Sequence, residues 1–189
     1  MMHVAAVAPA AIAVTWEEAK AHLRLDGEQE KAFVEGLIAA ATQHVGGPDG
    51  WLGRSIGVQV LEVRLELPDD AIIRLPLPPI VEIVSVVYLD RSGVGHTVAA
   101  DTFDLFDGEI ERPAAGWPWL NGSQRRDALR IRYRAGYETV PPPIKAAILM
   151  MVGDMHRFRT SASDISVTPN AIPMSATVDD LLQPYRVYR

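Results

Sequence analysis

The chain has 189 residues, enough for one compact domain with its own core, and it contains no cysteine. Disulfides and thiolate chemistry are therefore excluded, and a zinc site would depend on His and carboxylate ligands. The formal net charge of −6 argues against a dedicated nucleic-acid-binding domain, because such domains usually carry a basic surface. No run of about 18 consecutive apolar residues occurs, so the sequence predicts no membrane span.

Charge is unevenly distributed along the chain. Residues 1–112 hold 8 Lys and Arg against 18 Asp and Glu, whereas residues 113–189 hold 10 against 6. An acidic surface on one copy can meet a basic surface on the next, so this polarity is compatible with head-to-tail contacts between identical subunits. An incidental surface composition explains the same numbers equally well.

Residues 1–14 form an apolar arm that loosely resembles a signal peptide but carries no Lys or Arg. Thr15 and Glu18 then match a capping box, which predicts a short helix over residues 16–24. Apolar residues at helical spacing predict a second helix over residues 28–45. The turn-rich stretch GGPDGWLG that follows ends helical structure.

The middle of the chain has the pattern of β-strands. Apolar and polar residues alternate over residues 56–67, and residues 82–90 are rich in β-branched residues that suit a central strand. Asp107-Gly108 is a favoured hairpin turn. In the last strand, Leu129, Ile131 and Tyr133 alternate with three arginines. We expect an antiparallel β block over residues 56–137.

Three prolines, Pro141 to Pro143, separate this block from a third helix. Proline is tolerated at the first helical position, so the helix is expected to start at Pro143 and to run to Arg159. Its middle is apolar on almost every side, which requires more than one neighbour, and other copies of the chain are candidates for some of these neighbours. The residues predicted to pack between subunits are Ile144, Ile148, Met151, Met155 and Phe158.

The last 30 residues read as a tail. Residues 160–178 contain turn formers without periodicity, so we expect an extended or mobile linker there. A short apolar cluster follows, which is typical of a docking peptide, although it can also fold back on its own domain. The predicted docking residues are Leu181, Leu182, Pro184, Tyr185 and Arg186.

The order of elements, helices then strands then a helix, indicates an α+β fold. We expect a small helical bundle with an inserted antiparallel β block and an extended C-terminal tail. The predicted organisation is an arm (1–14), one domain (15–159, with helices at 15–45 and 143–159 and the β insertion at 56–137) and a flexible tail (160–189).

Residues 53–57 match the G-x-S-x-G motif of serine hydrolases, with Ser55 as the candidate nucleophile. That motif needs a strand before the serine and a helix after it, whereas here a loop precedes and a strand follows. The five histidines show no zinc-binding spacing, and no phosphate-binding glycine motif is present. We therefore expect no catalytic, metal or cofactor site.

Arg130, Arg132 and Arg134 lie on one face of the last strand. Such a row can bind phosphate or an acidic partner. The alternative, which we prefer, is a solvated face where these arginines pair across strands with Glu62 and Glu66.

The runs VTWEEAKAHLRLDGEQEKAFVEGLIAAATQHV, RLPLPPIVEIVSVVYLDRSG and RAGYETVPPPIKAAILMMVGDMHRFR, in this order and spacing, resemble the head-tail connector (adaptor) proteins of long-tailed bacteriophages and gene transfer agents. The likeness covers about residues 14–159 and extends to the closing LLQPYRVYR. The turn-rich stretch after the second helix contains more glycine than this family leads us to expect.

The resemblance implies a non-enzymatic virion protein, made in the bacterial host cytoplasm. It implies a ring of about twelve copies under the portal that extends the DNA channel and joins the head to the next neck protein and the tail, with DNA passing without sequence-specific binding. The C-terminal docking residues would then be the portal anchor. Alternatives are another neck, tail-end or baseplate protein and, more remotely, a serine hydrolase.

Overall fold

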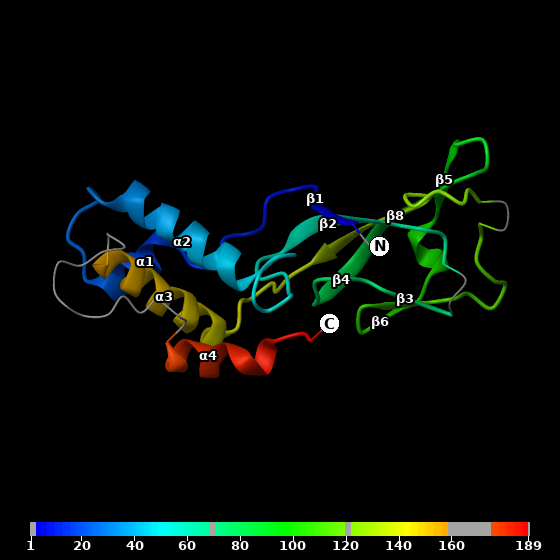
Figure 1. Ribbon diagram of the computed structural model, residues 1–189. Coiled ribbons are helices and arrows are strands. Elements are labelled where there is room, and N and C mark those ends of the chain that lie inside the picture. Colours follow the sequence, from blue (N-terminus) through cyan, green and yellow to red (C-terminus); the bar gives the residue numbers. More distant parts are fainter. Residues whose placement is uncertain (1–2, 69–70, 120–121, 159–174, 189) are drawn as a thin grey trace. The chain divides into compact units, whose positions relative to one another are not determined.

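The computed structural model describes residues 3–68, 71–119, 122–158 and 175–188 (Figure 1). Within these ranges the chain is α+β, as predicted, with helices and antiparallel sheets. It divides into two compact units. The sheet unit comprises Met1–Ala11 and Gly57–Glu138, and the helix unit comprises Ile12–Ile56 and Thr139–Arg189.

The sheet unit is built on a five-stranded antiparallel sheet in which β8 lies at the centre. Leu129, Ile131 and Tyr133 of β8 are buried, whereas the arginines between them point to the other face, as the alternation predicted. The order across the sheet is β1 (His3–Ala6), β2 (Gln59–Leu65), β8 (Leu129–Ala135), β4 (Ile80–Leu89) and β5 (Gly95–Val98).

Strand β1 corrects the prediction of a separate N-terminal arm. His3 to Ala6 pair antiparallel with Arg64 to Leu61 of β2, so part of the expected arm is an edge strand of the main sheet. The first 14 residues lack the alternation of a half-exposed strand. Backbone pairing with β2 and the packing of Val4 against the core hold His3 to Ala6 at this edge.

A second, three-stranded sheet has the order β3 (Ile72–Arg74), β7 (Glu109–Glu111) and β6 (Leu105–Phe106), and η1 (Ala100–Thr102) precedes β6 in the chain. Asp107 and Gly108 both have positive φ, at 47° and 80°, as a two-residue hairpin turn of type I′ requires. The predicted hairpin is confirmed. Both sheets contribute to one hydrophobic core, where the hydroxyl of buried Tyr133 donates to the Pro76 carbonyl at 2.8 Å.

The helix unit contains α1 (Trp16–Leu23), α2 (Lys31–Val45), α3 (Pro142–Arg157), α4 (Ala176–Leu182) and η2 (Gln183–Tyr185). Figure 1 shows α2 beside α3, with α4 along another side of α3. The predicted capping box is confirmed, since the Glu18 amide donates to Thr15 Oγ1 at 3.2 Å and the Thr15 amide donates to Glu18 Oε2 at 2.8 Å.

The boundaries of the longer helices differ slightly from the prediction. Helix α2 begins at Lys31 rather than residue 28, and α3 begins at Pro142 and ends at Arg157. The predicted last residue of α3, Arg159, lies outside the described residues. Lys145 of α3 reaches Glu18 of α1 at 2.6 Å, and this hydrogen bond is the main reason that the pKa of Glu18 is lowered.

Helix α4 corrects the prediction of an extended tail. Residues 160–174 of the predicted linker lie outside the described part of the chain, but Ala176 to Leu182 are helical. Ser175 caps this helix by accepting from the Val178 amide at 3.3 Å. Val178 and Leu182, four residues apart on one face, are fully buried as α4 packs on α3. Two apolar positions are too few to predict a helix by periodicity.

The turn between β4 and β5 gives a pH-dependent prediction. Asp90 accepts hydrogen bonds from the amides of Ser92 and Val94, and His96 Nε2 lies 2.8 Å from its Oδ2. The contact with His96 is the largest cause that holds the pKa of Asp90 below 3.8. Because the pKa of Asp90 is lower in the folded turn than in the unfolded chain, its carboxylate stabilises the turn fully at pH values above the unfolded pKa. This stabilisation is lost as the pH falls through the folded pKa.

We therefore expect the Ser92 and Val94 amides to lose protection, measured as their exchange rate relative to the intrinsic rate at the same pH, only when the pH falls below 3.8. The variant His96→Ala should raise the pKa of Asp90, so that the loss of protection begins at a higher pH. Carboxyl-carbon NMR titration and amide exchange measure both quantities. Identical Asp90 titrations in the two proteins would contradict this account of the turn.

Candidate interaction surfaces

Ser55, the candidate nucleophile, lies in a loop that leads to β2 and is completely buried. The next element after Ser55 is strand β2, so the strained strand-to-helix turn that exposes a nucleophilic serine is not formed. Its surroundings are those of a core residue.

Several titratable side chains in the described ranges form ion pairs. No group of three or more His, Asp and Glu residues that could hold a metal ion occurs among the described residues. His96 pairs with Asp90, and His156 Nε2 lies 2.7 Å from Glu30 Oε2. None of the helices described has the length and apolar character needed to cross a membrane.

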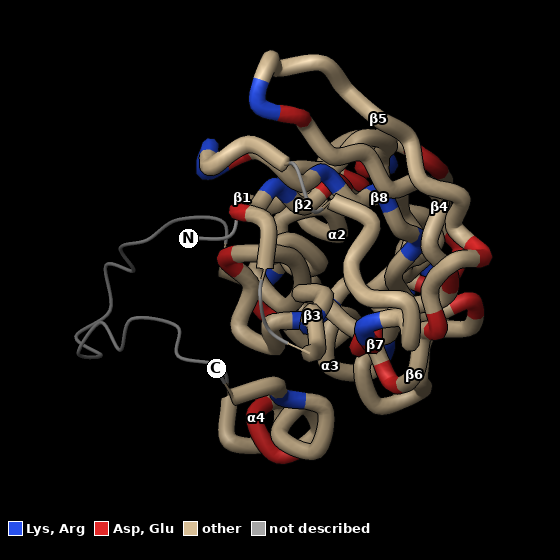
Figure 2. Tube along the Cα trace, turned by 90° about the vertical axis from the view of Figure 1, so that its right-hand side faces the viewer, with Lys and Arg blue, Asp and Glu red and all other residues tan. Residues whose placement is uncertain are grey.

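The arginine row on β8 is paired with carboxylates. Arg132 Nε lies 2.7 Å from Glu62 of β2, and Arg134 reaches Glu82 of β4 at 2.8 Å. Arg130 contacts Asp127 at 3.4 Å. Figure 2 shows basic and acidic positions side by side along β2 and β8. The prediction of cross-strand pairing is confirmed for Glu62, and the other partners differ from the predicted Glu66.

Among the carboxylates that pair with these arginines, Glu62 is the best buried, with 6% of the residue exposed. Arg64 also binds it, at 2.7 Å, so two guanidinium groups share one carboxylate. The hydrogen bond from Arg132 is the largest cause that lowers the pKa of Glu62. A face with this internal pairing has little unbalanced positive charge to offer to phosphate.

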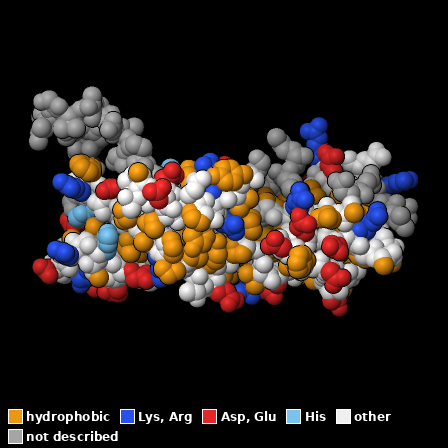
Figure 3. Space-filling model, turned by 90° about the horizontal axis from the view of Figure 1, so that it is seen from below, with side chains coloured by type: hydrophobic (Ala, Val, Ile, Leu, Met, Phe, Trp, Pro, Cys, Tyr) orange, Lys and Arg blue, Asp and Glu red, His pale blue; other side chains and the backbone are white. Residues whose placement is uncertain are grey.

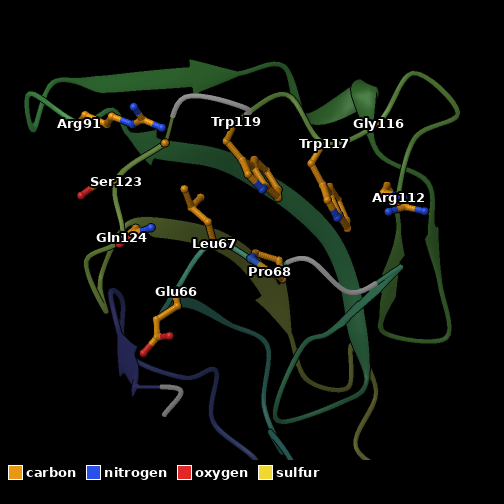
Figure 4. A pocket seen from close by; sticks show the side chains of 11 residues that line it. Glu66, Leu67, Pro68, Arg91, Arg112, Gly116, Trp117, Trp119, Ser123 and Gln124 are labelled. Atoms are coloured by element: carbon orange, nitrogen blue, oxygen red, sulfur yellow. The ribbon is translucent and has the colours of Figure 1, made fainter.

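A pocket of about 730 Å³ opens in the sheet unit beside two stacked indoles (Figure 4). Trp117 and Trp119 lie 4.8 Å apart between ring centroids, with 12° between their planes. Figure 4 shows Arg91 and Arg112 on opposite sides of the opening. Neither arginine has an ion-pair partner among the described residues.

The indoles of this pocket belong mainly to the core. Trp117 and Trp119 are only 8% and 6% exposed, and the ring centroid of Phe103 lies 6.2 Å from the ring centroid of each indole. The buried Nε1 of Trp119 has no hydrogen-bond partner. Because a ligand could reach so little of either ring, the stack is better explained as aromatic packing than as a binding platform.

The predicted docking residues fall on both sides of the C-terminal segment, residues 175–188. Leu182 is fully buried against the helix unit, and Leu181 and Tyr185 are half-buried. Pro184 and Arg186 are exposed. Figure 3 shows hydrophobic side chains gathered on the face seen from below, where α4 lies in Figure 1. Only part of the predicted set can therefore contact a partner in this conformation.

The C-terminal segment is held by the turn-rich loop after α2, which we call the glycine loop (residues 46–54). The Val187 amide donates to the Leu52 carbonyl at 2.9 Å, and Arg54 Nε donates to the Tyr185 carbonyl. The guanidinium of Arg186 lies 4.3 Å from the ring centroid of Trp51. The glycine loop thus binds residues 185–187, a role that was not predicted from the sequence.

Glycine is required in this loop at positions of close approach. A Cβ on Gly50 would overlap the backbone of Gly46, and a Cβ on Gly46 would overlap Ile56. Gly46 caps α2 by donating to Thr42, so the helix ends at Val45 as predicted. The glycine content that seemed unusual is what lets the loop fold tightly against the end of α2.

The residues predicted to pack between subunits, like the predicted docking residues, include both buried and accessible side chains. Ile144 and Ile148 are fully buried within the subunit itself. Met151 and Met155 are half-buried, and Phe158 is 53% exposed. Only the last three offer surface to another copy of the chain.

Comparison with solved structures relates the whole chain to components of gene transfer agent (GTA) particles. A chain of "Neck of empty GTA particle computed with C6 symmetry" has a TM-score of 0.77 at 19% identity, covering 99% of this chain and 96% of the other. A chain of "Virion of native gene transfer agent (GTA) particle" has a TM-score of 0.72 at 20% identity, covering 98% and 96%.

A third chain, from "Neck of native GTA particle computed with C12 symmetry", has a TM-score of 0.70 at 18% identity, covering 99% of this chain and 96% of the other. No family model matches the sequence, and no curated protein matches it. At these identities the comparison establishes a shared fold.

Proposed function

We propose that this protein is a structural head-tail connector in the neck of a phage or phage-like particle. One observation carries the proposal. The fold matches chains from two GTA neck structures and one GTA virion structure over 98–99% of its length, with both units included. The sequence resemblance points to the same role. The protein would have no enzymatic activity, which accords with the buried Ser55 and with the described titratable groups that form pairs.

The connector would form a ring of copies. Two of the matching structures were computed with C6 and C12 symmetry, which is compatible with the twelve copies that the resemblance implies. A ring of identical copies needs two different contact surfaces on each subunit. Met151, Met155 and Phe158 of α3 are our candidates for one of them.

The partners of the ring would be the portal protein on one side and the next neck or tail protein on the other, with DNA passing through the channel. The exposed docking residues, Pro184 and Arg186 with the accessible parts of Leu181 and Tyr185, would contact the portal. Leu182 would hold the segment in place from inside. A net charge of −6 suits a channel wall that must not retain DNA.

The proposal is tested by producing particles from cells that lack this protein. We expect filled heads without attached tails, and we expect purified protein to restore attachment. Tailed particles in its absence, or its location at the tail tip, would favour the alternative of a tail-end or baseplate protein. Labelling of Ser55 by a fluorophosphonate probe would favour the hydrolase alternative.

A further inference from the structure

The C-terminal segment and the glycine loop together build an exposed aromatic and cationic cluster. The Arg186 guanidinium lies over two rings, 4.3 Å from the centroid of Trp51 and 5.1 Å from that of Tyr188. Tyr188 is 68% exposed, and its hydroxyl accepts a hydrogen bond of 2.6 Å from Gln183. We call Trp51, Arg186 and Tyr188 the arginine sandwich.

The sandwich holds Arg186 in a defined position without neutralising it. The backbone on either side is fixed, because Tyr185 O accepts from Arg54 and the Val187 amide donates to Leu52. Arg186 has no carboxylate partner among the described residues. Stacking on ring faces leaves the N–H groups at the edge of the guanidinium free to donate, and their planar arrangement matches a carboxylate.

We infer that the arginine sandwich is a binding site for a carboxylate on an acidic segment of a different neck protein. The inference rests on the proposed function. It is supported by the unpaired charge and by continuity with the predicted docking residues, which end at Arg186. Trp, Tyr and Arg are the residues that dominate the energy of protein interfaces, and here they lie together on a preformed surface.

The site is tested with tail-less particles that lack the protein and with purified variants added back. Arg186→Glu should weaken binding about tenfold or more, and Arg186→Met, which keeps the stacked surface but not the charge, should weaken it similarly. Arg126→Glu is the matched control, because Arg126 is also exposed and has no ion-pair partner among the described residues. Amide exchange of α4 should be unchanged in the variants.

A second measurement identifies the partner group. A carbodiimide joins a lysine directly to a carboxylate that contacts it. Arg186→Lys should therefore cross-link to an Asp or Glu of another protein of the particle, whereas Arg126→Lys should not. A cross-link to a second copy of this chain, or to none, would overturn the inference.

The outcomes separate this inference from the proposed function. Normal binding of Arg186→Glu would overturn the carboxylate site and leave the connector role intact. Failure of the wild-type protein to bind the particles would overturn both.

Discussion

Replacing Ile148 by alanine should lower the free energy of unfolding of the isolated protein by about 2–5 kcal/mol. Ile148 is fully buried in α3 and is surrounded by the helices of its own subunit. The substitution removes buried apolar surface and leaves a cavity among the packed helices. Urea denaturation followed by circular dichroism of the purified subunit measures the change.

The matched control is Phe158→Ala at the end of the same helix. With 53% of Phe158 exposed, its removal should change the stability of the isolated subunit little, while weakening contacts in the ring if α3 lies at the subunit boundary. Equal destabilisation by the two substitutions would show that the division into an internal and an external face of α3 is wrong.

Leu182→Asp should release the C-terminal segment from the helix unit. A carboxylate at this fully buried position would lose its hydration without gaining a partner, so α4 is expected to detach rather than bury the charge. Amide exchange should then lose protection over residues 176–187, including the Val187 amide bound to Leu52, while α2 and α3 keep theirs.

Thr177→Asp introduces the same charge on the exposed side of α4 and should leave the segment bound, because an acidic residue near a helix N-terminus is favourable. If Leu182→Asp left residues 176–187 fully protected, the packing of α4 on α3 could not be the contact that holds the segment.

Regular periodicity in the sequence predicted the long elements well. The alternation along β8 and the helical spacing in α3 each bury one set of side chains, so pattern and packing agree. The capping box at Thr15 and the turn at Asp107 and Gly108 were predictable because their chemistry is local.

Elements that depend on distant partners were not predictable. Strand β1 is ordered by pairing with β2, more than 50 residues away in the chain. Helix α4 has only Val178 and Leu182 as buried anchors, and both require α3 to be in place. Neither signal exists within the segment itself.

The candidate site was predicted in part. The docking residues were chosen for their apolar and basic character, which cannot distinguish an inward Leu182 from an outward Pro184. Trp51 was overlooked because it lies in a turn-rich loop, although a tryptophan among glycines is itself a sign of a packed or binding loop. Its pairing with Arg186 joins residues 135 positions apart, which only the tertiary structure reveals.

The central claim, a connector ring at the junction of head and tail, is tested most directly by locating the protein in intact particles. Cryo-electron microscopy of the purified particle neck should show copies of this fold arranged in a ring next to the portal, with the C-terminal segment on the portal side. Density for this fold at the tail tip alone, or a neck complete without it, would contradict the account.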